Sequence, residues 1–484
     1  MRQFDTPNND MLAIFHVNDD TPATRDMALR ATDEFKGRIF MRHVLLAATA
    51  FATTLISVPA FAQTVTFWQF STNPNDIAAW EGIIEAFEAS HEGIDVVMEI
   101  VPWSEQQQRL VTALTTGGLP DVSMLGNNVV AQFQAIGALA PLDDAFAAYD
   151  AEHGTDVAAD IWPGDRGYYN LGGQWWASPI AVETRALYYR KDLFEAAGLT
   201  MPEQPTYDQI GEFAERLTDK SKEQYGICLR GKPGWGENMA FLGTLVNTHG
   251  GQWFDMDWQP QIDSQPWQQA ITYYVDLMTK YGPPGAVSNG FNENQALFQT
   301  GKCAIWIDAT SAAGRVYDPK QSEVADKIAF APAPQAVTPA GSAWFWAWSL
   351  AIPSSSTKAD VAKSFIAWAT SRDYVKLVGE NEGWVAVPPG TRLSTYALPE
   401  YQEAAPFAAT VLASIEAADP AKPTKDPVPY TGIQYVTIPE FQGIGTVVGQ
   451  QISAALAGQT SVEAALKAAQ DYAAREMTRA GYPK

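Results

Sequence analysis

The sequence predicts an α/β fold with two lobes that are joined by crossing segments rather than by a flexible tether. Two observations support this prediction. Strand-like and helix-like segments alternate in the first part of the chain after residue 62, and a second region of the same kind follows. No internal repeat and no low-complexity linker separates the two regions. A length of 484 residues is enough for two or three domains.

The first region reads as strand, helix, strand, helix, strand. TVTFWQF (64–70) and IDVVMEIV (94–101) are rich in β-formers, and LPDVSML (119–125) reads as a short buried strand. Apolar residues at helical spacing follow Asn75-Asp76, and EQQQRLVTALTTGG (105–118) reads as a helix closed by glycine. This alternation is typical of a parallel sheet, whose ligands bind beyond the carboxyl ends of the strands. The rule points to Gln69 and to Asn127 and Asn128.

The second region also contains both predicted strands and predicted helices, and it is not an internal repeat of the first. Its predicted strands are ALYYR (186–190), YGICLR (225–230) and CAIWID (303–308), and its predicted helices are 207–218, 265–280 and the alanine-rich amphipathic segment 461–480.

The composition excludes some classes of partner. The hydrophobic content is 46% and the charged content is 18%, as in ordinary globular proteins. A formal net charge of -23 argues against nucleic acid, because neutralising phosphates requires an excess of lysine and arginine. We therefore expect a small, neutral ligand, and the same acidity favours a soluble monomer.

Residues 41–62 have the composition of a secretory signal peptide. A basic start at Met41-Arg42 precedes an apolar run over residues 44–58 and the small-residue sequence A-F-A at 60–62. We predict export, with the mature chain beginning at Gln63. We interpret residues 1–40 as an upstream extension from a start codon assigned before Met41, and a genuine extension, which would hinder targeting, is the alternative. Because no cysteine stands at the cleavage site, we expect a soluble protein in a Gram-negative periplasm.

The sequence contains two cysteines, Cys228 and Cys303. In an oxidising compartment they can form a disulfide, and two separately buried thiols are about equally compatible with the sequence.

Motifs for enzymes do not stand out. His91, His153 and His249 have no metal-binding spacing, so we expect no metal site. There is no G-x-S-x-G elbow, and the glycines at 443–449 fit neither the dinucleotide fingerprint nor a Walker loop. A carboxylate pair for glycoside hydrolysis remains open, although no residue pair is singled out.

Binding of a hydroxylated ligand fits the sequence better. Such a ligand presents apolar C–H faces and polar O–H edges, so its site needs flat aromatic rings together with amides, carboxylates and guanidinium groups. Five segments interleave such residues. They are VPWSEQ with Trp103, GNN with Asn127 and Asn128, the apolar SPIAVETRALYYR with Glu183, the glycine-rich LRGKPGWGENM with Arg230, Trp235, Glu237 and Asn238, and AIWIDAT with Trp306 and Asp308.

The segment GSAWFWAWSLAIP adds three tryptophans. If it is extended, alternation puts Trp344, Trp346 and Trp348 on one face. We interpret Trp344 and Trp346 as a ring wall over a ligand and Trp348 as a core residue. Structural roles compete elsewhere, since Asn127 and Asn128 could cap the following helix and Arg230 could form a salt bridge. Glu183 stands between apolar neighbours and must find partners or lose hydration.

The same segments carry a resemblance. LPDV after a glycine-capped helix, PIAVE before YYRKDLFEAAGL, FQTGKCAIWID, WSLAIP and GWVAVPPGTR occur in the same order as in the extracellular sugar-binding proteins of ABC importers. The chain therefore resembles this family, which is typified by maltose-binding protein (family 1), over essentially all of its length after residue 62.

The resemblance implies a type II periplasmic binding protein fold. In that fold, each lobe is a mostly parallel sheet flanked by helices, and three crossings, near Ala181, Trp348 and Val387 here, form the hinge. The first lobe would comprise residues 63–182 and 349–387, and the second lobe residues 183–348 and 388–484. Positions matched to ligand contacts of the family are Gln69, Asn127, Asn128, Glu183, the 235–238 loop, the region of Asp308 and the tryptophans before the second crossing.

Departures from the family pattern narrow the ligand. Neutral Gln69, Asn127 and Asn128 stand where maltose-binding members carry charged groups, so we expect no long glucan site. ICLRGKPGWGENMAFL, GKCAIWIDAT and VYDPKQSEVADKIAFAPAP look most like the branch that binds sorbitol and mannitol. The resemblance implies a receptor that closes on a polyol and delivers it to membrane permease subunits, without cofactor, metal or catalysis. A receptor for another mono- or oligosaccharide and an exported carbohydrate-active enzyme are the alternatives.

Overall fold

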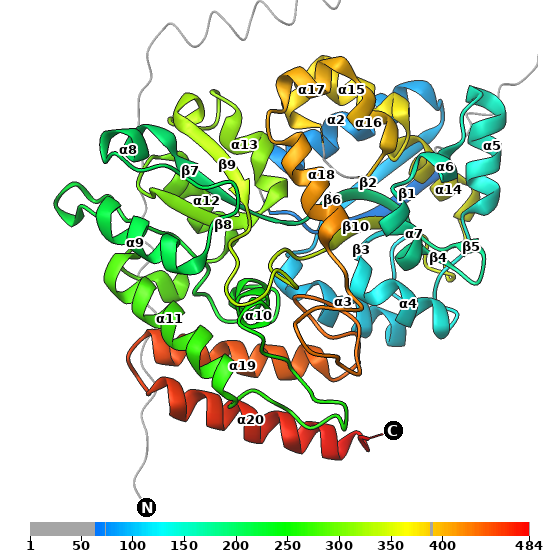
Figure 1. Cartoon of the computed structure of the whole chain (residues 1–484). Helices are drawn as coiled ribbons and strands as arrows, with labels where there is room; N and C mark the ends of the chain where they lie inside the picture. The colour runs from blue at the N-terminus through cyan, green and yellow to red at the C-terminus, as the bar shows by residue number, and fades with distance from the viewer. Residues whose placement is uncertain (1–62, 73, 388–390, 484) are drawn as a thin grey trace, which may run out of the picture. The chain divides into compact units, whose positions relative to one another are not determined.

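The computed structural model describes residues 63–72, 74–387 and 391–483 (Figure 1). These residues contain two main β-sheets, of five and three strands, and a separate two-stranded sheet. The predicted upstream extension and signal peptide, residues 1–62, lie outside the described residues.

The larger sheet has five strands in the order β2-β1-β3-β10-β6. β1 (Gln63–Gln69) lies parallel to both β2 (Ile94–Ile100) and β3 (Val122–Gly126), as the alternating pattern predicts. β10 (Trp346–Ala351) lies antiparallel between β3 and β6 (Ser178–Glu183). The sheet is therefore mixed, and its parallel part holds the first three strands.

Helices cover both faces of this sheet. Phe67 of β1 packs against Trp80 of α2 (Pro74–Ser90) and Phe365 of α14 (Ala359–Ala369), with ring centroids 4.9 and 5.7 Å away. On the opposite face the guanidinium of Arg109, in α3 (Trp103–Thr116), lies 4.5 Å from the ring centroid of Trp68. The remaining helices around this sheet are α4 (Asn127–Ala135), α5 (Asp143–His153), α6 (Val157–Asp160), α7 (Pro163–Tyr169), α15 (Arg372–Asn381), α16 (Leu393–Ala397) and α17 (Pro399–Ala404), and a small hairpin joins β4 (Asn170–Leu171) to β5 (Gln174–Trp175).

The smaller sheet has three strands in the order β8-β7-β9 and is antiparallel throughout. This differs in detail from the expected mostly parallel sheet. β7 (Arg185–Arg190) begins at the end of the sheet where β8 (Ile305–Ala309) and β9 (Ile328–Pro332) finish, so both neighbours run against it. The two-lobed α/β class is otherwise as predicted.

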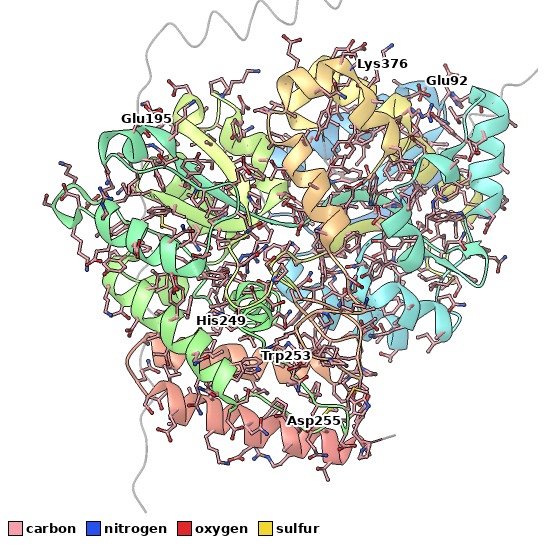
Figure 2. All side chains as sticks on the ribbon, in the orientation of Figure 1. Glu92, Glu195, His249, Trp253, Asp255 and Lys376 are labelled. Carbon is pink, nitrogen blue, oxygen red and sulfur yellow. A yellow bond between two sulfur atoms is a disulfide. The ribbon has the colours of Figure 1, made fainter. Side chains whose placement is uncertain are left out.

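The helices beside the smaller sheet enclose an aromatic core. Trp253 packs edge-on against Trp267 and Phe441, at 4.9 and 5.0 Å between centroids. Figure 2 shows Trp253 among these helices, whereas the exposed Glu195 and Lys376 project outward. The helices are α8 (Lys191–Ala196), α9 (Tyr207–Leu217), α10 (Asn238–Thr248), α11 (Gln265–Tyr281), α12 (Phe291–Gln299), α13 (Ala313–Tyr317), α18 (Ala408–Ala417), α19 (Phe441–Leu456) and α20 (Val462–Arg479).

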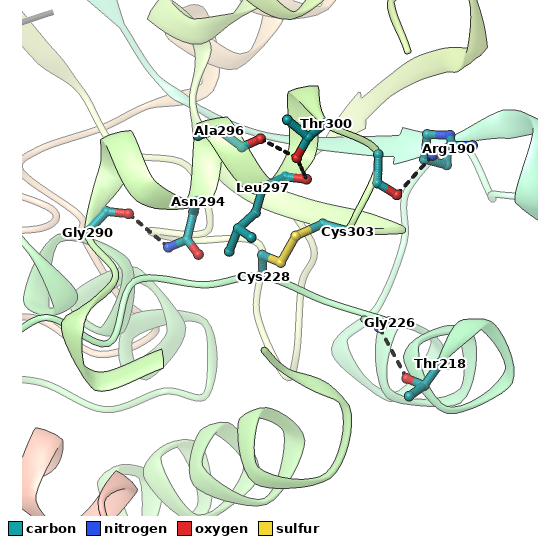
Figure 3. Close-up of a disulfide and its surroundings, with 11 residues drawn as sticks. Arg190, Thr218, Gly226, Cys228, Gly290, Asn294, Ala296, Leu297, Thr300 and Cys303 are labelled. Atoms are coloured by element: carbon teal, nitrogen blue, oxygen red, sulfur yellow. Dashed lines mark hydrogen bonds between the residues drawn. A yellow bond between two sulfur atoms is a disulfide. The ribbon is translucent and has the colours of Figure 1, made fainter. Parts of the chain in front are cut away.

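The predicted strand over residues 225–230 is wrong. This segment makes only isolated bridges, Tyr225 with Cys303 and Cys228 with Trp306, instead of a continuous ladder. A disulfide between Cys228 and Cys303 links it to the start of β8, with the two Cα atoms 6.0 Å apart (Figure 3). The disulfide settles the alternative that the cysteine count left open.

Two direct passages join the sheets. Only Thr184 separates β6 from β7, and it exchanges two hydrogen bonds with Thr310, donating its backbone N–H to the side-chain oxygen (3.0 Å) and accepting from the backbone N–H (2.8 Å). The chain returns from β9 to β10, and β10 pairs with β6. The two passages therefore lie in neighbouring, hydrogen-bonded strands.

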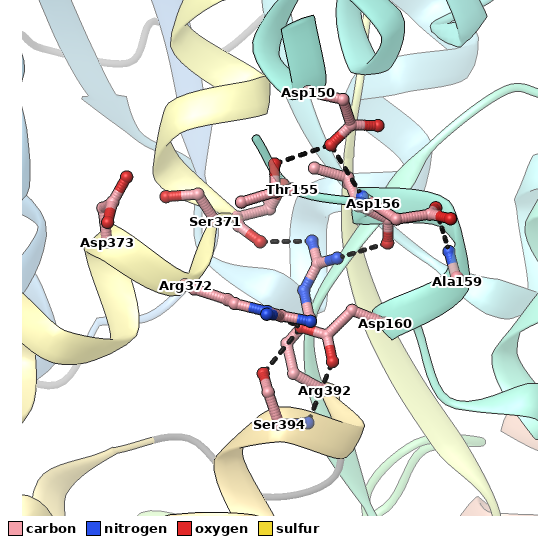
Figure 4. A network of polar contacts seen from close by, with 12 residues as sticks. Asp150, Thr155, Asp156, Ala159, Asp160, Ser371, Arg372, Asp373, Arg392 and Ser394 are labelled. Atoms are coloured by element: carbon pink, nitrogen blue, oxygen red, sulfur yellow. Dashed lines mark hydrogen bonds and ion pairs between the residues drawn. The ribbon is translucent and has the colours of Figure 1, made fainter. Parts of the chain in front are cut away.

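A buried polar network anchors the chain after residue 390 (Figure 4). Arg392 donates to the carbonyl of Val157 at 2.9 Å and also to that of Thr370, and Asp160 accepts from Arg372 at 3.0 Å and from the hydroxyl of Ser394 at 2.6 Å. These partners belong to the helices around the larger sheet. The chain after residue 390 therefore first contacts that group, and its contacts with β7 and β9 begin at Phe407 and α18.

Candidate ligand-binding site

A cavity of about 870 Å³ lies where residues of both sheets meet. This size is within the range of roughly 300–1,000 Å³ that is typical of small-molecule sites. Its walls include Phe70, Ser71 and Met124 at the carboxyl ends of β1 and β3, and Ala309 and Ser311 at the end of β8. The location agrees with the rule that ligands bind beyond strand ends in α/β sheets.

Four tryptophans form one side of the cavity: Trp235, Trp344, Trp346 and Trp348. The centroid of the Trp346 ring lies 5.8 Å from that of Trp235 and 5.3 Å from that of Trp348. Trp346 also approaches β3 closely, because a Cβ atom on Gly126 would lie 2.5 Å from the ring. Glycine at position 126 therefore gives the indole its place against the strand end.

Trp348 was predicted to be a core residue, and the structure instead places it in the cavity wall, half-buried. The reason lies in its strand neighbours. Trp348 is opposite Gly126 on β3 and Ala181 on β6, and neither residue has a side chain large enough to cover an indole. Alternation then presents Trp346 and Trp348 on the same face of β10.

Charged groups stand next to the tryptophans. Arg230 is held by Asp308, with its Nε 3.0 Å from Oδ2, and it donates Nη1–H to the carbonyl of Gly236 at 2.9 Å. Its guanidinium lies 5.7 Å from the ring centroid of Trp344 and 5.2 Å from that of Phe291. Arg230 is thus fixed among rings and a carboxylate at the cavity surface.

Two further carboxylates face the cavity. Glu237 pairs with Lys232 at 3.2 Å through Oε1, and its Oε2 is buried without a hydrogen-bond partner among the described residues. Glu183, the last residue of β6, is half-buried in the wall. Carboxylate oxygens accept hydrogen bonds, so both groups suit a ligand that offers several O–H donors.

Burial sets the charge states of these groups. Burial raises the pKa of Glu183 above its ordinary value, and the Ser311 hydroxyl and the Arg230 guanidinium oppose that rise. Burial likewise raises the pKa of Glu237, against the attraction of Arg230 and Lys232. For Arg230, burial lowers the pKa, but Asp308 outweighs it, so the pKa is raised and the side chain stays charged. The wall therefore combines a permanent cation with carboxylates that are poorly hydrated.

The structure brings six of the predicted site residues into the cavity wall. They are Glu183, Arg230, Trp235, Glu237, Trp344 and Trp346. Asp308 lies behind the wall and acts through Arg230. Trp103 begins α3, and its side chain is outside the described residues.

Two predicted residues have structural roles instead. Asn238 ties its loop to α19, donating to the carbonyl of Gly449 at 2.9 Å and to Ser453 Oγ at 3.1 Å. Trp306 is fully buried and stacks on Tyr188 at 5.0 Å, because α12 covers that face of β8. Alternation along a strand gives the shared face of its residues, and it does not say which face a helix covers.

Gln69, Asn127 and Asn128 do not line the cavity. Gln69 and Asn127 are almost fully buried, and their side-chain amides have no hydrogen-bond partner among the described residues. Gln69 directly precedes Phe70, which lines the cavity. Asn127 directly follows Gly126, which lies against the ring of Trp346. Asn128 is half-buried, and its side-chain oxygen also approaches Gly126.

Sequence reasoning missed other wall residues. Asp76 and Arg315 form an ion pair at 2.8 Å, and Phe291 lies between the guanidinium groups of Arg230 and Arg315, at 5.2 and 5.7 Å. In the sequence Asp76 stands only at the start of a predicted helix, and Phe291 follows a loop that contains no other aromatic residue nearby. A Cβ atom on the preceding Gly290 would lie 2.4 Å from Glu237 Oε2, so glycine at this position leaves room for that carboxylate, which only the structure shows.

The fold and this site define a binding protein with its ligand cavity between two joined sheets. Residues 71–376 match the model of the bacterial extracellular solute-binding protein family, and the chain belongs to that family. Among the described residues, no helix is long and apolar enough to cross a membrane.

Particular relatives are more similar still. The chain is 49% identical to the mannitol-binding protein of Pseudomonas aeruginosa over 435 residues, which is 90% of this chain and 98% of that protein. It is 52% identical, with a TM-score of 0.83, to an ABC transporter solute-binding protein from Agrobacterium vitis S4 with bound D-mannitol, covering 87% of this chain and 100% of that one. A ribitol complex from Agrobacterium radiobacter K84 is 25% identical, with a TM-score of 0.73, over 86% and 99% of the two chains.

Proposed function

We propose that this chain is the substrate-binding component of an ABC importer and that it binds a sugar alcohol of the mannitol type. The observation that carries the proposal is the 52% identity, over the whole of the other chain, to a solute-binding protein with bound D-mannitol. The composition of the wall supports it. Four indoles suit the C–H faces of a polyol, and Arg230, Glu183 and Glu237 suit its hydroxyl groups.

Binding operates by closure of the cavity. Residues from both sheets line it, so a ligand that contacts both sides stabilises the closed arrangement and shifts the equilibrium toward it. Each stacked ring supplies about 1 kcal/mol beyond its buried area, and charge-assisted hydrogen bonds supply the rest of the roughly 8 kcal/mol that micromolar binding requires.

The proposal includes partners and location. The mature protein begins at Gln63, is exported to the periplasm, works as a monomer and docks on membrane permease subunits, and it releases its ligand chemically unchanged. N-terminal sequencing of the exported protein and sedimentation at micromolar concentration test the first and third statements. A mature chain that begins elsewhere, or a stable dimer, contradicts them.

The ligand is tested by thermal shift and calorimetry with mannitol, sorbitol, arabinitol, ribitol, glucose, maltose and trehalose. A ligand at 100 times its Kd stabilises the native state by about 2.7 kcal/mol, which a melting curve resolves. We expect mannitol or sorbitol to raise the Tm most.

Two results contradict the polyol assignment. A larger shift with glucose, maltose or trehalose makes the chain a receptor for another saccharide, and release of product from a glycoside makes it an enzyme that uses the cavity carboxylates.

A further inference from the structure

One ion pair joins the two sides of the cavity. Arg315 Nη1 lies 2.8 Å from Asp76 Oδ1, although the residues are 239 positions apart in the chain. Asp76 is in the first turn of α2, which packs beside the larger sheet, and Arg315 is in α13, which follows the end of β8. The other ion pairs recorded for the described residues each stay on one side.

Each member of the pair is oriented by a neighbour on its own side. The hydroxyl of Ser71 donates to Asp76 Oδ2 at 2.7 Å, and Arg315 donates Nε–H to Gln295 Oε1 at 3.0 Å. Both carboxylate oxygens of Asp76 therefore already have protein partners. A pair held in this way loses little side-chain freedom when it forms, which favours it over an ordinary surface pair.

The surroundings also strengthen the contact. The Arg315 side chain is 15% exposed and that of Asp76 is 34% exposed, and the Arg315 guanidinium lies 5.7 Å from the ring centroid of Phe291. Partial burial limits screening by water and salt. The pair lies in the wall of the same cavity as the tryptophans, so whatever separates its two members also opens that cavity.

We propose that Asp76 and Arg315 are positioning residues: their ion pair holds the two sides of the cavity at the closed separation and so sets ligand affinity, while other residues contact the ligand. The proposal rests on the proposed function for its ligand, mannitol. Because affinity scales with the population of the competent form, weakening the pair raises the apparent Kd in proportion to the lost closed population.

The test measures closure and affinity separately. Labels at Glu92→Cys and Glu195→Cys, two exposed positions on opposite sides, report closure by single-molecule energy transfer in ligand-free protein. Calorimetry reports the Kd for mannitol. Asp76→Asn and Arg315→Gln should each reduce the high-transfer population and raise the Kd, by about three- to tenfold. The double variant Asp76→Arg/Arg315→Asp should restore both, because it keeps an ion pair with reversed polarity.

A matched control is Asp144→Asn. It removes the ion pair with Lys363, which joins α5 to α14 on one side only, and should change neither measurement. The proposal is overturned if single variants leave the ligand-free energy transfer unchanged. It is also overturned if the reversed pair restores closure but not affinity, because Asp76 or Arg315 then contacts the ligand directly. If no polyol binds and the variants still open the protein, the proposed function fails while the positioning role stands.

Discussion

Trp346 has three aromatic neighbours, since the ring centroids of Trp235 and Trp348 in the cavity wall and of Tyr435 behind it lie within 5.8 Å of its own. Trp346→Ala should therefore weaken mannitol binding by about tenfold or more, because it removes a stacking surface and leaves a hole between the remaining rings. Calorimetry measures the change. Trp258→Ala is the control, since Trp258 is half-buried against Phe254 and lies outside the cavity wall. If the two variants had equal Kd values, Trp346 would not contribute to ligand binding.

Asp165 supplies a prediction about pH. It is fully buried in α7, neither of its carboxylate oxygens has a hydrogen-bond partner among the described residues, and burial raises its pKa well above the ordinary 3.8, against the opposing attraction of Arg392. The native state then holds a proton that the unfolded chain releases above about pH 3.8. Stability from this group is complete below that pH and is lost as the pH rises toward the folded-state value.

Asp165→Asn should accordingly stabilise the protein at pH 7, on the order of 1 kcal/mol or more, with the gain shrinking toward pH 4. Thermal melts at several pH values measure this. Asp160→Asn should behave in the opposite way. Burial raises the pKa of Asp160, but its hydrogen bonds to Arg372 and Ser394 outweigh burial and lower the pKa, so its contribution is present at neutral pH and lost on acidification. Parallel pH profiles for the two variants would show that the two carboxyl groups have the same charge state.

For single residues, the sequence predicted a place in the site correctly where the adjacent residues in the chain make the residue unusual. Trp344 and Trp346 stand out by spacing, and Glu183 stands out as a carboxylate between apolar residues. Asp76 and Arg315 could not be paired, because nothing local relates positions 239 residues apart. Trp348 was placed in the core because the small sizes of its partners on β3 and β6 depend on strand register, which the sequence does not give.

Among the elements, the disulfide between Cys228 and Cys303 takes the place of a β-ladder for residues 225–230. It closes a loop with a sequence separation of 75 residues, for which chain entropy predicts a contribution of about 4 kcal/mol to stability. Cys228→Ala with Cys303→Ala should lower the Tm, and reductant should have the same effect on the native sequence once unfolding exposes the bond. If neither the substitutions nor the reductant changed the Tm, the hydrogen bonds of this segment would be sufficient to hold it without the disulfide.

The elements that the sequence predicted well carry their own signals. Gly117, in the left-handed region at φ 78°, ends α3, and Ser461 accepts from the Ala464 backbone at the start of α20, as the glycine and serine at those positions indicate. Residues 225–230 failed because YGICLR has the composition of a strand but stands beside β8 with only scattered bridges. The composition of a segment gives its strand propensity. A continuous ladder also needs a partner strand, and β8 forms its ladder with β7 instead of with residues 225–230.

For the whole molecule, a ligand held by both sheets should protect both at once. Hydrogen exchange with mannitol present should slow in the loop that carries Arg230 and Trp235 and in the first turn of α2, by at least about tenfold in each where binding is saturated. Mass spectrometry of peptides from the two regions measures this. Protection confined to one region would mean that the ligand binds one side without closing the other.

Only Thr184 lies between β6 and β7, and its two hydrogen bonds with Thr310 restrain the backbone at this connection. Because β6 is hydrogen-bonded to β10, we expect a rotation of one strand to move the other. We therefore expect the two sheets to open mainly about this pair of hydrogen-bonded strands, because the two passages described above run through them. A substitution that weakens the pairing of β6 with β10 should then change the fraction of molecules that are open.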